Sequence, residues 1–494
     1  MRTRKRHILI VGGGTSGTVL AARLSEDPDL FVTLLEAGPD DDMYGADVFE
    51  PARAASAWAG NTPIAINVMA TEAGTIPMFQ GRILGGTSAV NGLATLRGLP
   101  SDYDEWAAAG LQGWGWKDVV DTFIAAENDM DFGASPLHGD SGPLSVRRWR
   151  HGELSHAQRT FYDAMVEMGE PSVADINDPS QLPGIGVFPV SIDKAGKRVT
   201  TSLAYLTPAV RARDNLVIRT NTNVARIALE DGRALGVVLT TGEHLATDEV
   251  VLTAGAISSP VLLLRSGLGP KAHLAERGIR LHADLPVGST MSDHLGPGIA
   301  YRHKGRRGGI AGPAQVLLAG ASNGVDVDYH AFPIAPAPSE DNETDFIMAV
   351  FLMRSSGRGS VRLGEALDSD PVITAPPLPD DAVGRFRHAF DRIAAWERSE
   401  VARGLGCEPV EGHDLSAPDA VRTALERLTL SYYHMTSTCP MGAVLDADCR
   451  VHGIEGLRVA DASVMPTIPT GNTYLGCVMI AERVARKMRA QHGK

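Results

Sequence analysis

The amino-terminal part of the chain combines short apolar runs with one amphipathic stretch. Apolar residues dominate 7–11 and 31–35, and between these runs they recur over 19–24 at the spacing of a helix face. Three glycines follow the first run directly. This order predicts a strand, a glycine turn, a helix and a second strand, which together form a βαβ unit of a parallel sheet.

Helical spacing returns at several later places. Apolar residues fall on one helix face over 116–127 and 156–168, and again over 382–403, 416–428 and 478–489. We therefore expect five further helices, the last of them near the carboxyl terminus.

Strand-like alternation in the middle of the chain predicts a separate small sheet. Short alternating segments at 216–219, 225–229, 235–239 and 249–252 are separated by Gly, Asn or Asp turns, which favours an antiparallel insertion. Residues 39–105 show poor periodicity instead, and turn-forming residues are frequent in their first half. We expect extended loops there.

The region 297–380 is rich in Gly and Pro and contains three strand candidates. These are Val325–Phe332, Thr344–Leu352 and Ser360–Leu363. With the helices predicted after them, they indicate a second domain of mixed α+β type. A further strand is predicted over 456–460.

Composition excludes several classes of protein. The chain has 494 residues, of which 44% are hydrophobic and 21% charged, as in soluble globular proteins of two to four domains. Lys and Arg number 46 against 59 Asp and Glu, and the net charge of −13 disfavours nucleic acid as a partner. No uninterrupted apolar run reaches the roughly 18 residues of a membrane-spanning helix, so no membrane span is expected.

Cysteine usage bears on metal binding and on the cellular compartment. The four cysteines, Cys407, Cys439, Cys449 and Cys477, form no C-x-x-C pair. This pattern argues against a disulfide framework and against a thiolate metal site. We expect reduced thiols, a cytoplasmic protein and no bound metal.

A dinucleotide-binding motif lies at the first predicted turn. Gly12, Gly14 and Gly17 follow the strand and open the helix, where glycines let a pyrophosphate approach the backbone and the helix amides. Glu36 ends the next strand, where a carboxylate binds ribose hydroxyls. A carboxylate there disfavours the 2′-phosphate of NADP, so FAD and NAD remain as candidate cofactors.

Five further stretches resemble signatures of a single family. In chain order they are GRILGGTSAVNG at 81–92, GAISSPVLLLRSGLG at 255–269, DHL at 293–295, YHMTSTCPMG at 433–442, and RVADAS at 458–463 running on to PTGNT at 469–473. On these motifs the chain is identified as a member of the glucose-methanol-choline (GMC) oxidoreductase family, and the resemblance spans residues 7–488. The stretch 131–143 and the compact length are similar to short bacterial members of actinobacterial type.

This resemblance implies a mixed α/β and α+β fold. A Rossmann-like FAD-binding domain built from noncontiguous segments is expected to accompany a substrate-binding domain that contains an antiparallel sheet. The expected boundaries are 1–140, 199–296 and 433–494 for the FAD-binding domain, and 141–198 and 297–432 for the substrate-binding domain.

The stretch 81–92 looks like the flavin-contacting loop of the family. Glycines there let the backbone approach the flavin, and hydroxyl and amide groups offer hydrogen bonds to it. Val90 occupies the position at which some relatives carry a His linked covalently to FAD, so noncovalent FAD is expected. The residues assigned to flavin contact are Gly85, Thr87, Ser88, Asn91 and Gly92.

His434 matches the family's active-site His, and Asn472 matches its partner position. Alcohol oxidation requires a base for the hydroxyl proton, and a histidine with a reference pKa of about 6.5 suits that role. The amide of Asn472 can orient the substrate oxygen or stabilise developing alkoxide charge. Both are therefore assigned to catalysis, with hydride transfer to flavin N5 implied by the resemblance.

Other positions matching the family are assigned to cofactor binding. Asp461 corresponds to an acidic residue beside the pyrophosphate and ribityl chain, and Val224 to a residue that reaches the adenine through its backbone. Thr95 departs from the family pattern, which leaves the identity of the alcohol open. The remaining cofactor residues are Thr15, Ser16, Ala462 and Thr473.

Three other functions compete with alcohol oxidation. Gly320-Ala321-Ser322-Asn323-Gly324 has the G-x-S-x-G spelling of a hydrolase nucleophile elbow, but a strand pattern follows where the elbow requires a helix. Some relatives keep FAD structurally and cleave hydroxynitriles, so a lyase is a second alternative. A noncatalytic flavin-binding protein is disfavoured by the presence of both His434 and Asn472.

The sequence therefore predicts an FAD-dependent oxidoreductase that converts an alcohol to a carbonyl compound. Oxygen, a quinone or a redox carrier can each serve as the electron acceptor, and oxidase and dehydrogenase stay undecided.

Overall fold

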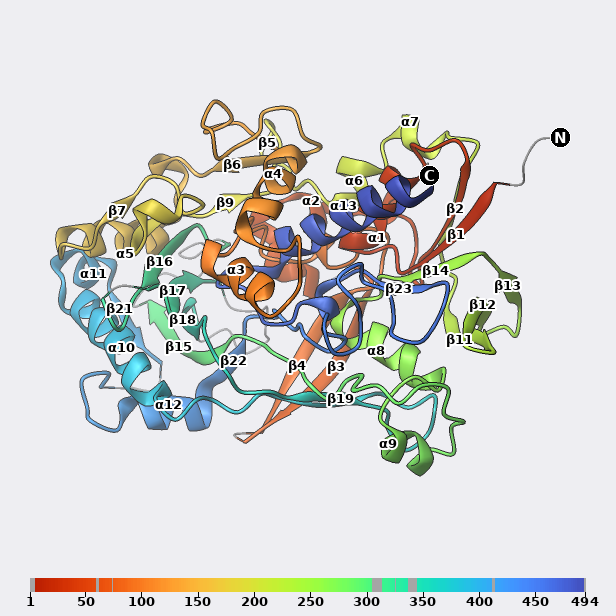
Figure 1. Ribbon diagram of the computed structural model, residues 1–494. Coiled ribbons are helices and arrows are strands. Elements are labelled where there is room, and N and C mark those ends of the chain that lie inside the picture. Colours follow the sequence, from red (N-terminus) through yellow and green to blue (C-terminus); the bar gives the residue numbers. More distant parts are fainter. Residues whose placement is uncertain are drawn as a thin grey trace.

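The fold is that of a computed structural model, which describes residues 5–58, 62–72, 74–303, 313–324, 326–335, 344–410 and 414–492. A parallel sheet with its helices occupies one side of the molecule, and a large, mostly antiparallel sheet occupies the other (Figure 1). This arrangement confirms the predicted combination of a Rossmann-like sheet with an antiparallel substrate-domain sheet.

Five strands from distant parts of the chain form the parallel sheet. Their order is β10-β2-β1-β14-β23, and every neighbouring pair is parallel. The strands are β10 (Leu216–Arg219), β2 (Leu30–Leu35), β1 (Arg6–Val11), β14 (Glu249–Leu252) and β23 (Leu457–Val459).

The segments 216–219 and 249–252 were expected in an antiparallel insertion, but they form β10 and β14 of this parallel sheet. That part of the prediction was wrong. All four residues of β14 are buried, as in a central parallel strand covered on both faces. The middle segments do form an antiparallel sheet, made of β11 (Val224–Glu230), β12 (Arg233–Leu239) and β13 (His244–Ala246). Strands of four residues are too short for alternation to reveal their partners.

Two helices near opposite ends of the chain cover the parallel sheet together. α1 (Thr15–Leu24) packs against α13 (Thr473–His492), and the Ser16 hydroxyl donates a hydrogen bond to the Cys477 carbonyl at 3.2 Å. α13 begins five residues before the predicted terminal helix. α8 (Gly255–Arg265) lies directly after β14 and is almost entirely buried.

The second sheet has the order β21-β15-β18-β17-β16-β8-β7, with β22 paired to β15. All its pairs are antiparallel except that of β7 with β8. Its strands are β21 (Cys407–Pro409), β15 (Leu295–His303), β18 (Phe346–Leu352), β17 (Tyr329–Ile334), β16 (Val316–Gly320), β8 (Gly184–Val187), β7 (Ser172–Val173) and β22 (Thr429–Ser431). The predicted strand at 325–332 thus starts later than expected, and Val325 lies outside the described residues.

The two faces of this sheet have different neighbours. On one face Tyr301, Leu318 and Phe346 pack against a helical layer. On the other face Leu317, Phe332 and Phe351 pack with Leu93 and Leu96, which follow the glycine-rich loop. This second face is therefore turned toward the cofactor side. The helical layer comprises α5 (His156–Glu167), α10 (Ala382–Arg398), α11 (Glu400–Leu405) and α12 (Ala420–Leu428).

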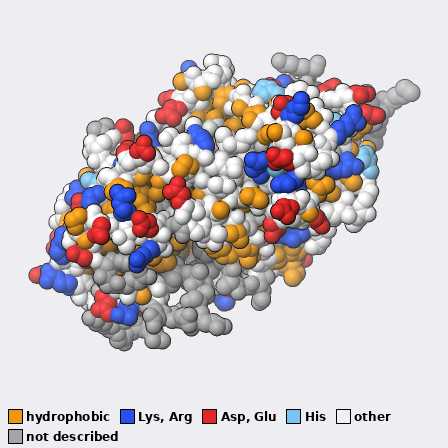
Figure 2. Space-filling view, turned by 90° about the horizontal axis from the view of Figure 1, so that it is seen from below, with side chains coloured by type: hydrophobic (Ala, Val, Ile, Leu, Met, Phe, Trp, Pro, Cys, Tyr) orange, Lys and Arg blue, Asp and Glu red, His pale blue; other side chains and the backbone are white. Residues whose placement is uncertain are grey.

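Residues 39–105 contain regular structure where loops were predicted, so that prediction was wrong. A hairpin of β3 (Ile64–Thr71) and β4 (Gly74–Gly81) joins β19 (Ser360–Arg362) and β20 (Val372–Thr374) in a four-stranded sheet. Ile66 and Val68 are each 55% exposed, so the hairpin lacks the usual alternation of buried apolar and exposed polar residues. Figure 2 views the molecule from below relative to Figure 1, and apolar side chains are visible on the face that it shows.

Shorter elements complete the described chain. A three-stranded sheet consists of β5 (Glu127–Asp129), β6 (Leu144–Arg148) and β9 (Pro189–Val190). The remaining helices are α2 (Ala46–Phe49), α3 (Pro100–Ala108), α4 (Trp116–Ala126), α6 (Thr201–Tyr205), α7 (Pro208–Arg211) and α9 (Lys271–Glu276), and the 3₁₀ turns are η1 (Asp41–Met43), η2 (Pro51–Trp58), η3 (Gly86–Ala89), η4 (His151–Glu153), η5 (Pro179–Gln181) and η6 (Ala462–Val464). Among all described helices, none has the length and apolarity needed to cross a membrane.

Candidate active site and cofactor groove

The predicted dinucleotide turn lies at the carboxyl end of β1. Gly12 has a φ of +106°, and a Cβ atom on Gly17 would lie 1.9 Å from the Gly12 carbonyl oxygen. Only glycine fits either position. Gly14 precedes α1 without a side-chain cap, so the amides of the first helical turn, beginning at Thr15, remain available to a phosphate group.

Glu36 lies where the prediction placed it, at the end of β2. Its carboxylate accepts hydrogen bonds from the amides of Gly13 and Gly38, each at 2.8 Å. Burial raises the pKa of Glu36, and these two hydrogen bonds oppose the increase. The amide of Thr222 donates to the Glu36 carbonyl at 2.8 Å, which places Val224, at the start of β11, on the same side of the sheet.

The glycine-rich loop packs directly on the dinucleotide turn. The amide of Gly85 donates to the Gly13 carbonyl at 2.8 Å, and a Cβ atom on Gly86 would lie 2.6 Å from the Gly14 Cα atom. The predicted pyrophosphate and flavin segments therefore form one continuous surface. The Ser88 hydroxyl donates to the Gly85 carbonyl at 2.6 Å and so fixes the turn.

A buried arginine that the sequence prediction missed holds this loop in place. Arg198 donates to the Asn91 side-chain oxygen at 2.6 Å, to the Asn91 carbonyl at 2.8 Å and to the Ser88 carbonyl at 3.2 Å. Burial lowers the pKa of Arg198 to about 10. Thr87 accepts a bond from the Gly81 amide at 3.3 Å, whereas Gly92 is exposed and a side chain there would meet open space.

Asp461 joins two segments beside the groove. Its carboxylate accepts hydrogen bonds from the Gly255 amide at 2.8 Å and the Ser259 hydroxyl at 2.6 Å, both in α8. It also accepts bonds from the amide and hydroxyl of Ser463, at 2.9 and 2.5 Å. The Asp461 carboxylate is thus engaged within the protein.

These features fit FAD. The uncapped start of α1 suits a pyrophosphate, the Glu36 carboxylate lies beside the turn at Gly13, and Gly86 lets the glycine-rich loop pack closely on Gly14. Val90, at the position of a covalent histidine in some relatives, is buried and has no nucleophilic atom.

His434 and Asn472 come together from different segments. The Nδ2 atom of Asn472 lies 2.9 Å from Nε2 of His434. His434 belongs to the loop after β22, in which Tyr433 has a φ of +61°, and Asn472 directly precedes α13, whose first residue is Thr473. A bulky residue with positive φ marks a constrained backbone, as is common at active sites.

A second buried histidine contacts His434 from the other side. Nδ1 of His294 lies 2.9 Å from Nδ1 of His434, and Nε2 of His294 lies 3.1 Å from the Met353 carbonyl oxygen. Burial lowers the pKa of His294 to about 3, and burial followed by the charges of His294 and His330 lowers the pKa of His434 well below its usual value. His434 is therefore neutral and able to accept a proton. The motif at 293–295 signalled this residue, but no role was assigned to it.

Asp293 anchors both histidine segments through their backbones. Its carboxylate accepts hydrogen bonds from the amides of His294 and His434, at 2.8 and 2.9 Å, and from the Ser431 hydroxyl at 2.5 Å. Burial raises its pKa to about 6.

Tyr432 supports the face of the His434 ring. It stacks between Phe351 and His434, with centroid distances of 4.4 and 4.1 Å. Burial raises the pKa of its hydroxyl, and the Asn472 side chain opposes the increase. The Tyr432 hydroxyl and Oδ1 of Asn472 are buried and lack hydrogen-bond partners among the described residues, as expected for groups that face a ligand position.

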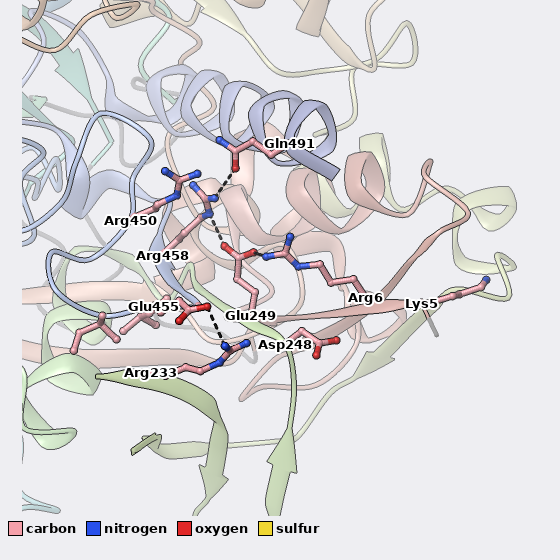
Figure 3. A pocket seen from close by; sticks show the side chains of 12 residues that line it. Lys5, Arg6, Arg233, Asp248, Glu249, Arg450, Glu455, Arg458 and Gln491 are labelled. Carbon is pink, nitrogen blue, oxygen red and sulfur yellow. Dashed lines mark hydrogen bonds and ion pairs between the residues drawn. The ribbon is translucent and has the colours of Figure 1, made fainter. Parts of the chain in front are cut away.

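One surface pocket lies far from this site. It measures about 580 Å³ and lies at the amino ends of β1, β14 and β23, whereas the glycine turn lies at the carboxyl end of β1. The guanidinium groups of Arg6 and Arg458 converge on Glu249 there, at 2.6 and 2.5 Å (Figure 3). The pocket therefore does not include His434, Asn472 or the glycine turn.

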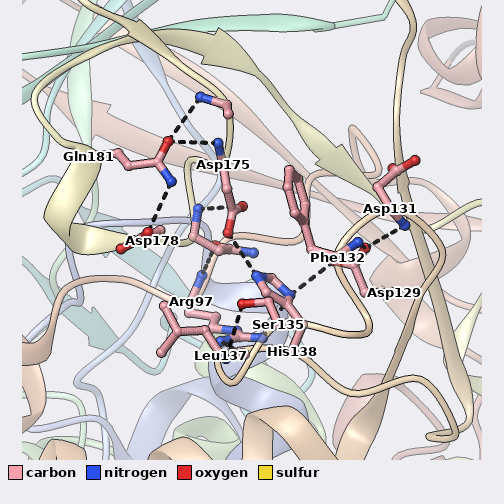
Figure 4. A network of polar contacts seen from close by, with 12 residues as sticks. Arg97, Asp129, Asp131, Phe132, Ser135, Leu137, His138, Asp175, Asp178 and Gln181 are labelled. Carbon is pink, nitrogen blue, oxygen red and sulfur yellow. Dashed lines mark hydrogen bonds and ion pairs between the residues drawn. The ribbon is translucent and has the colours of Figure 1, made fainter.

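A buried ionic network fastens the segment around 127–148 to the rest of the molecule. His138 contacts Glu127, Asp129 and Asp175 at 2.7 to 3.0 Å. Figure 4 shows the side chains of Asp129 and Asp175 directed toward the His138 ring. Arg97 pairs with Glu127, and Arg148 pairs with Asp129 and Asp175. Glu127, Asp129 and His138 have the spacing of metal ligands, but three cations already neutralise the three carboxylates. The carboxylates raise the pKa of His138 to about 10 against the effect of burial.

The hydrolase motif does not form a nucleophile elbow. Ser322 follows β16 in a turn, and among the described residues after it the next element is strand β17 rather than a helix. The Ser322 hydroxyl bonds the carboxylate of Asp328, which also pairs with Arg385 at 3.0 Å.

Comparison with known proteins gives a consistent result over nearly the whole chain. Residues 6–296 and 355–481 match the amino- and carboxyl-terminal parts of the GMC oxidoreductase family. An oxygen-dependent choline dehydrogenase of Burkholderia cenocepacia is 34% identical, over 99% of this chain and 94% of its own. A 5-(hydroxymethyl)furfural oxidase of Methylovorus sp. is also 34% identical, over 98% of both chains.

Solved structures agree with these relatives. The crystal structure of pyridoxine 4-oxidase from Mesorbium loti superposes with a TM-score of 0.88 at 29% identity and covers 98% of this chain and 99% of its own. A fungal aryl-alcohol oxidase shares the fold, with a TM-score of 0.81 at 20% identity and full coverage of both chains. The chain therefore belongs to the GMC oxidoreductase family and is an FAD-dependent alcohol oxidase or dehydrogenase.

Proposed function

We propose that the protein oxidises primary alcohols, with His434 as the catalytic base and Asn472 as the group that positions the alcohol oxygen. The observation that carries this proposal is the 2.9 Å contact between Nδ2 of Asn472 and Nε2 of His434. The Asn472 amide donates this hydrogen bond, so Nε2 of His434 carries a lone pair that points toward Asn472. Choline, 5-(hydroxymethyl)furfural and pyridoxine, for which three similar proteins are named, all carry a CH₂OH group.

An alcohol oxygen bound between these side chains accepts a hydrogen bond from Asn472 and donates its proton to Nε2 of His434. The Tyr432 ring keeps the imidazole plane fixed, and the buried surroundings keep the imidazole neutral before the proton arrives. FAD held in the groove would supply the acceptor for the hydride that leaves the carbinol carbon. The N-terminus of α13, directly after Asn472, is suitably placed to favour developing negative charge.

We assign the FAD to the groove formed by the glycine turn, Glu36, the glycine-rich loop and the Asp461 segment, and we propose that it is bound noncovalently because Val90 cannot form a link. Val224 contributes backbone near the adenine. Ser16 and Thr18 support α1 from inside, since the Thr18 hydroxyl donates to the Gly14 carbonyl at 3.0 Å. The other residues of the proposed groove are Gly12, Gly14, Thr15, Gly17, Gly85, Thr87, Ser88, Asn91, Gly92, Ala462 and Thr473.

Three further proposals concern organisation and setting. All five strands of the parallel sheet lie within the proposed cofactor segments 1–140, 199–296 and 433–494, whereas the four-stranded sheet joins β3 and β4 to β19 and β20 of the proposed substrate segment. Cys439, Cys449 and Cys477 are buried and free, which supports a reducing, cytoplasmic environment. Placement among short actinobacterial-type members is supported by the stretch 131–143 and by the compact length of the chain.

The test is anaerobic mixing with primary alcohols, sugars, aryl alcohols and reduced carriers, followed by exposure to air. Bleaching of the yellow flavin by a primary alcohol is the expected result. Rapid recovery in air identifies oxygen as acceptor, and recovery only after addition of a quinone or carrier identifies a dehydrogenase. Turnover of a hydroxynitrile without bleaching by any alcohol would establish a lyase and overturn the proposal.

A further inference from the structure

His294 lies on the side of His434 that faces away from Asn472. Its ring is fully buried and meets the His434 ring edge-on, with an interplanar angle of 84° and a centroid distance of 5.2 Å. The only two ring nitrogens of His294 are both engaged, Nδ1 with His434 at 2.9 Å and Nε2 with the Met353 carbonyl at 3.1 Å.

The three contacts determine where the protons are. A carbonyl oxygen only accepts hydrogen bonds, so Nε2 of His294 carries a proton. A neutral imidazole has one such proton, and Nδ1 of His294 is therefore an acceptor. The hydrogen between the two rings then belongs to Nδ1 of His434, and Nε2 of His434 is left with a lone pair toward Asn472. Any other neutral arrangement loses at least one of these bonds.

We propose that His294 is a positioning residue that holds His434 in the tautomer required of a base and shares the proton that the base receives. This inference rests on the proposed function of His434. When the alcohol O–H bond breaks, a new N–H bond forms at Nε2 of His434, and the ring becomes positively charged. The hydrogen bond from Nδ1 of His434 to His294 then strengthens, and the proton in it can move to Nδ1 of His294.

The surroundings of His294 suit this role. The ionisable groups that face it are His434, His330, Tyr432 and Asp293. Burial raises the pKa of the Tyr432 hydroxyl, so near neutral pH Asp293 is the one of these four groups that can be negatively charged. The Asp293 carboxylate bonds the backbone amides of both histidines, so it lies beside the charge that forms without taking a ring proton. Burial keeps both His294 and His330 neutral beforehand, with pKa values lowered to about 3.

Two substitutions separate this role from simple packing. In His294→Leu the acceptor for Nδ1 of His434 is lost. In His294→Asn the side-chain oxygen takes the place of Nδ1, so the acceptor is kept but no basic nitrogen remains. His330→Leu is the matched control, because His330 is equally buried but makes no hydrogen bond to His434 among the described residues.

The first readout is the ¹⁵N signals of the imidazole rings in flavin-loaded, histidine-labelled protein, with His434 assigned by its loss in His434→Ala. We expect a protonated Nδ1 on His434 in the wild type, His294→Asn and His330→Leu, and a shift of the proton toward Nε2 in His294→Leu. An unchanged His434 tautomer in His294→Leu overturns the proposal.

The second readout is anaerobic flavin reduction. We expect the rate to fall about 10²-fold in His294→Leu and about tenfold in His294→Asn, with an unchanged dissociation constant for the alcohol. If the flavin of His294→Asn is reduced at the wild-type rate, His294 does not share the proton. This test does not require that His294→Leu folds. The tautomer readout needs no substrate, so its result does not depend on whether His434 is the catalytic base. The assignment of His434 as base is tested separately and fails only if the flavin of His434→Ala is reduced at the wild-type rate.

Discussion

Asn472 donates its amide hydrogen to Nε2 of His434 across 2.9 Å, so in the free enzyme the two side chains satisfy each other. An alcohol that binds between them replaces one hydrogen bond by two, one from the amide and one to the imidazole. Binding therefore leaves neither Nδ2 of Asn472 nor Nε2 of His434 without a partner, and a second donor on the substrate would provide one for the buried Oδ1 of Asn472.

Removal of the base is expected to stop flavin reduction without loss of flavin. In His434→Ala the alcohol proton has no acceptor, and we expect a rate about 10²–10⁴ times lower. Asn472→Ala is expected to slow the same step less, and the double variant to be little slower than His434→Ala, because both residues act on one oxygen. Stopped-flow absorbance measures each rate, and additive losses in the double variant would show that the two side chains act independently.

Flavin reduction is expected to depend little on pH near neutrality. Because burial lowers the pKa of His434 well below its usual value, the neutral, proton-accepting form persists as the pH falls from about 8 to about 6. The limiting rate constant of anaerobic reduction should stay level over this range and decline only in more acidic solution. A clear midpoint above about 6.5 would contradict the inferred state of the base.

Cofactor retention is expected to depend on the absence of a side chain at Gly17. In Gly17→Ala the new methyl group would lie 1.9 Å from the Gly12 carbonyl, so the turn must open and FAD affinity should fall at least tenfold. Gly384→Ala is the matched control, since Gly384 lies within α10, is exposed and has open space around it. That substitution should stabilise the protein by about 0.5–1 kcal/mol. Flavin fluorescence after ultrafiltration measures how much FAD each variant retains. Equal retention in the two variants would contradict the inferred need for a close approach between Gly17 and the Gly12 carbonyl.

The buried network around His138 is expected to stabilise the fold strongly. His138 and His151 each contact an aspartate at 2.7 Å, but the His138–Asp175 pair is buried and the His151–Asp163 pair is exposed. His138→Leu leaves buried carboxylates without their partner and should cost about 3–5 kcal/mol, whereas His151→Leu should cost less than about 1 kcal/mol. Denaturant unfolding gives both values.

The same network gives the sign of a pH effect. The pKa of His138 is raised to about 10, so its stabilising contribution is complete below about pH 6.5 and is lost as the pH rises through about 10. In the wild type the free energy of unfolding should therefore decline in alkaline solution more steeply than in His138→Leu. Parallel declines would assign the alkaline loss to other groups.

Ser322 is expected to be dispensable for activity. Its hydroxyl bonds Asp328 within a turn, and Ser322→Ala should keep the wild-type rate of flavin reduction. A complete loss of activity in a folded, flavin-loaded variant would return Ser322 to the candidate catalytic residues.

The sequence predicted the parallel sheet well because buried strands and glycine turns leave local patterns. His7–Val11 and Phe31–Leu35 pair side by side as expected. The β3–β4 hairpin was missed because Ile66 and Val68 are apolar but exposed, so its pattern carries no alternation. Whether a four-residue segment such as 249–252 pairs in parallel depends on contacts with residues far away in the chain, which no local pattern records.

The candidate site was predictable only in part for a related reason. His434 and Asn472 were found through motifs, and the structure brings them within 2.9 Å. Arg198 and His294 act through contacts with segments 107 and 140 residues away, and neither position carries a local signal for its partner. Only the three-dimensional structure shows that Asn91 and His434 depend on them.

The position of β23 beside β14, with α13 packed on α1, has a consequence for synthesis of the protein. A ribosome makes the glycine turn and Glu36 within the first forty residues, yet the groove has no Asp461, Asn472 or α13 until nearly five hundred residues have been joined. Contacts over such separations form slowly and leave early segments exposed for a long time. The complete groove therefore cannot form before the segment that carries Asp461, Asn472 and α13 has been made, although its glycine turn is made first.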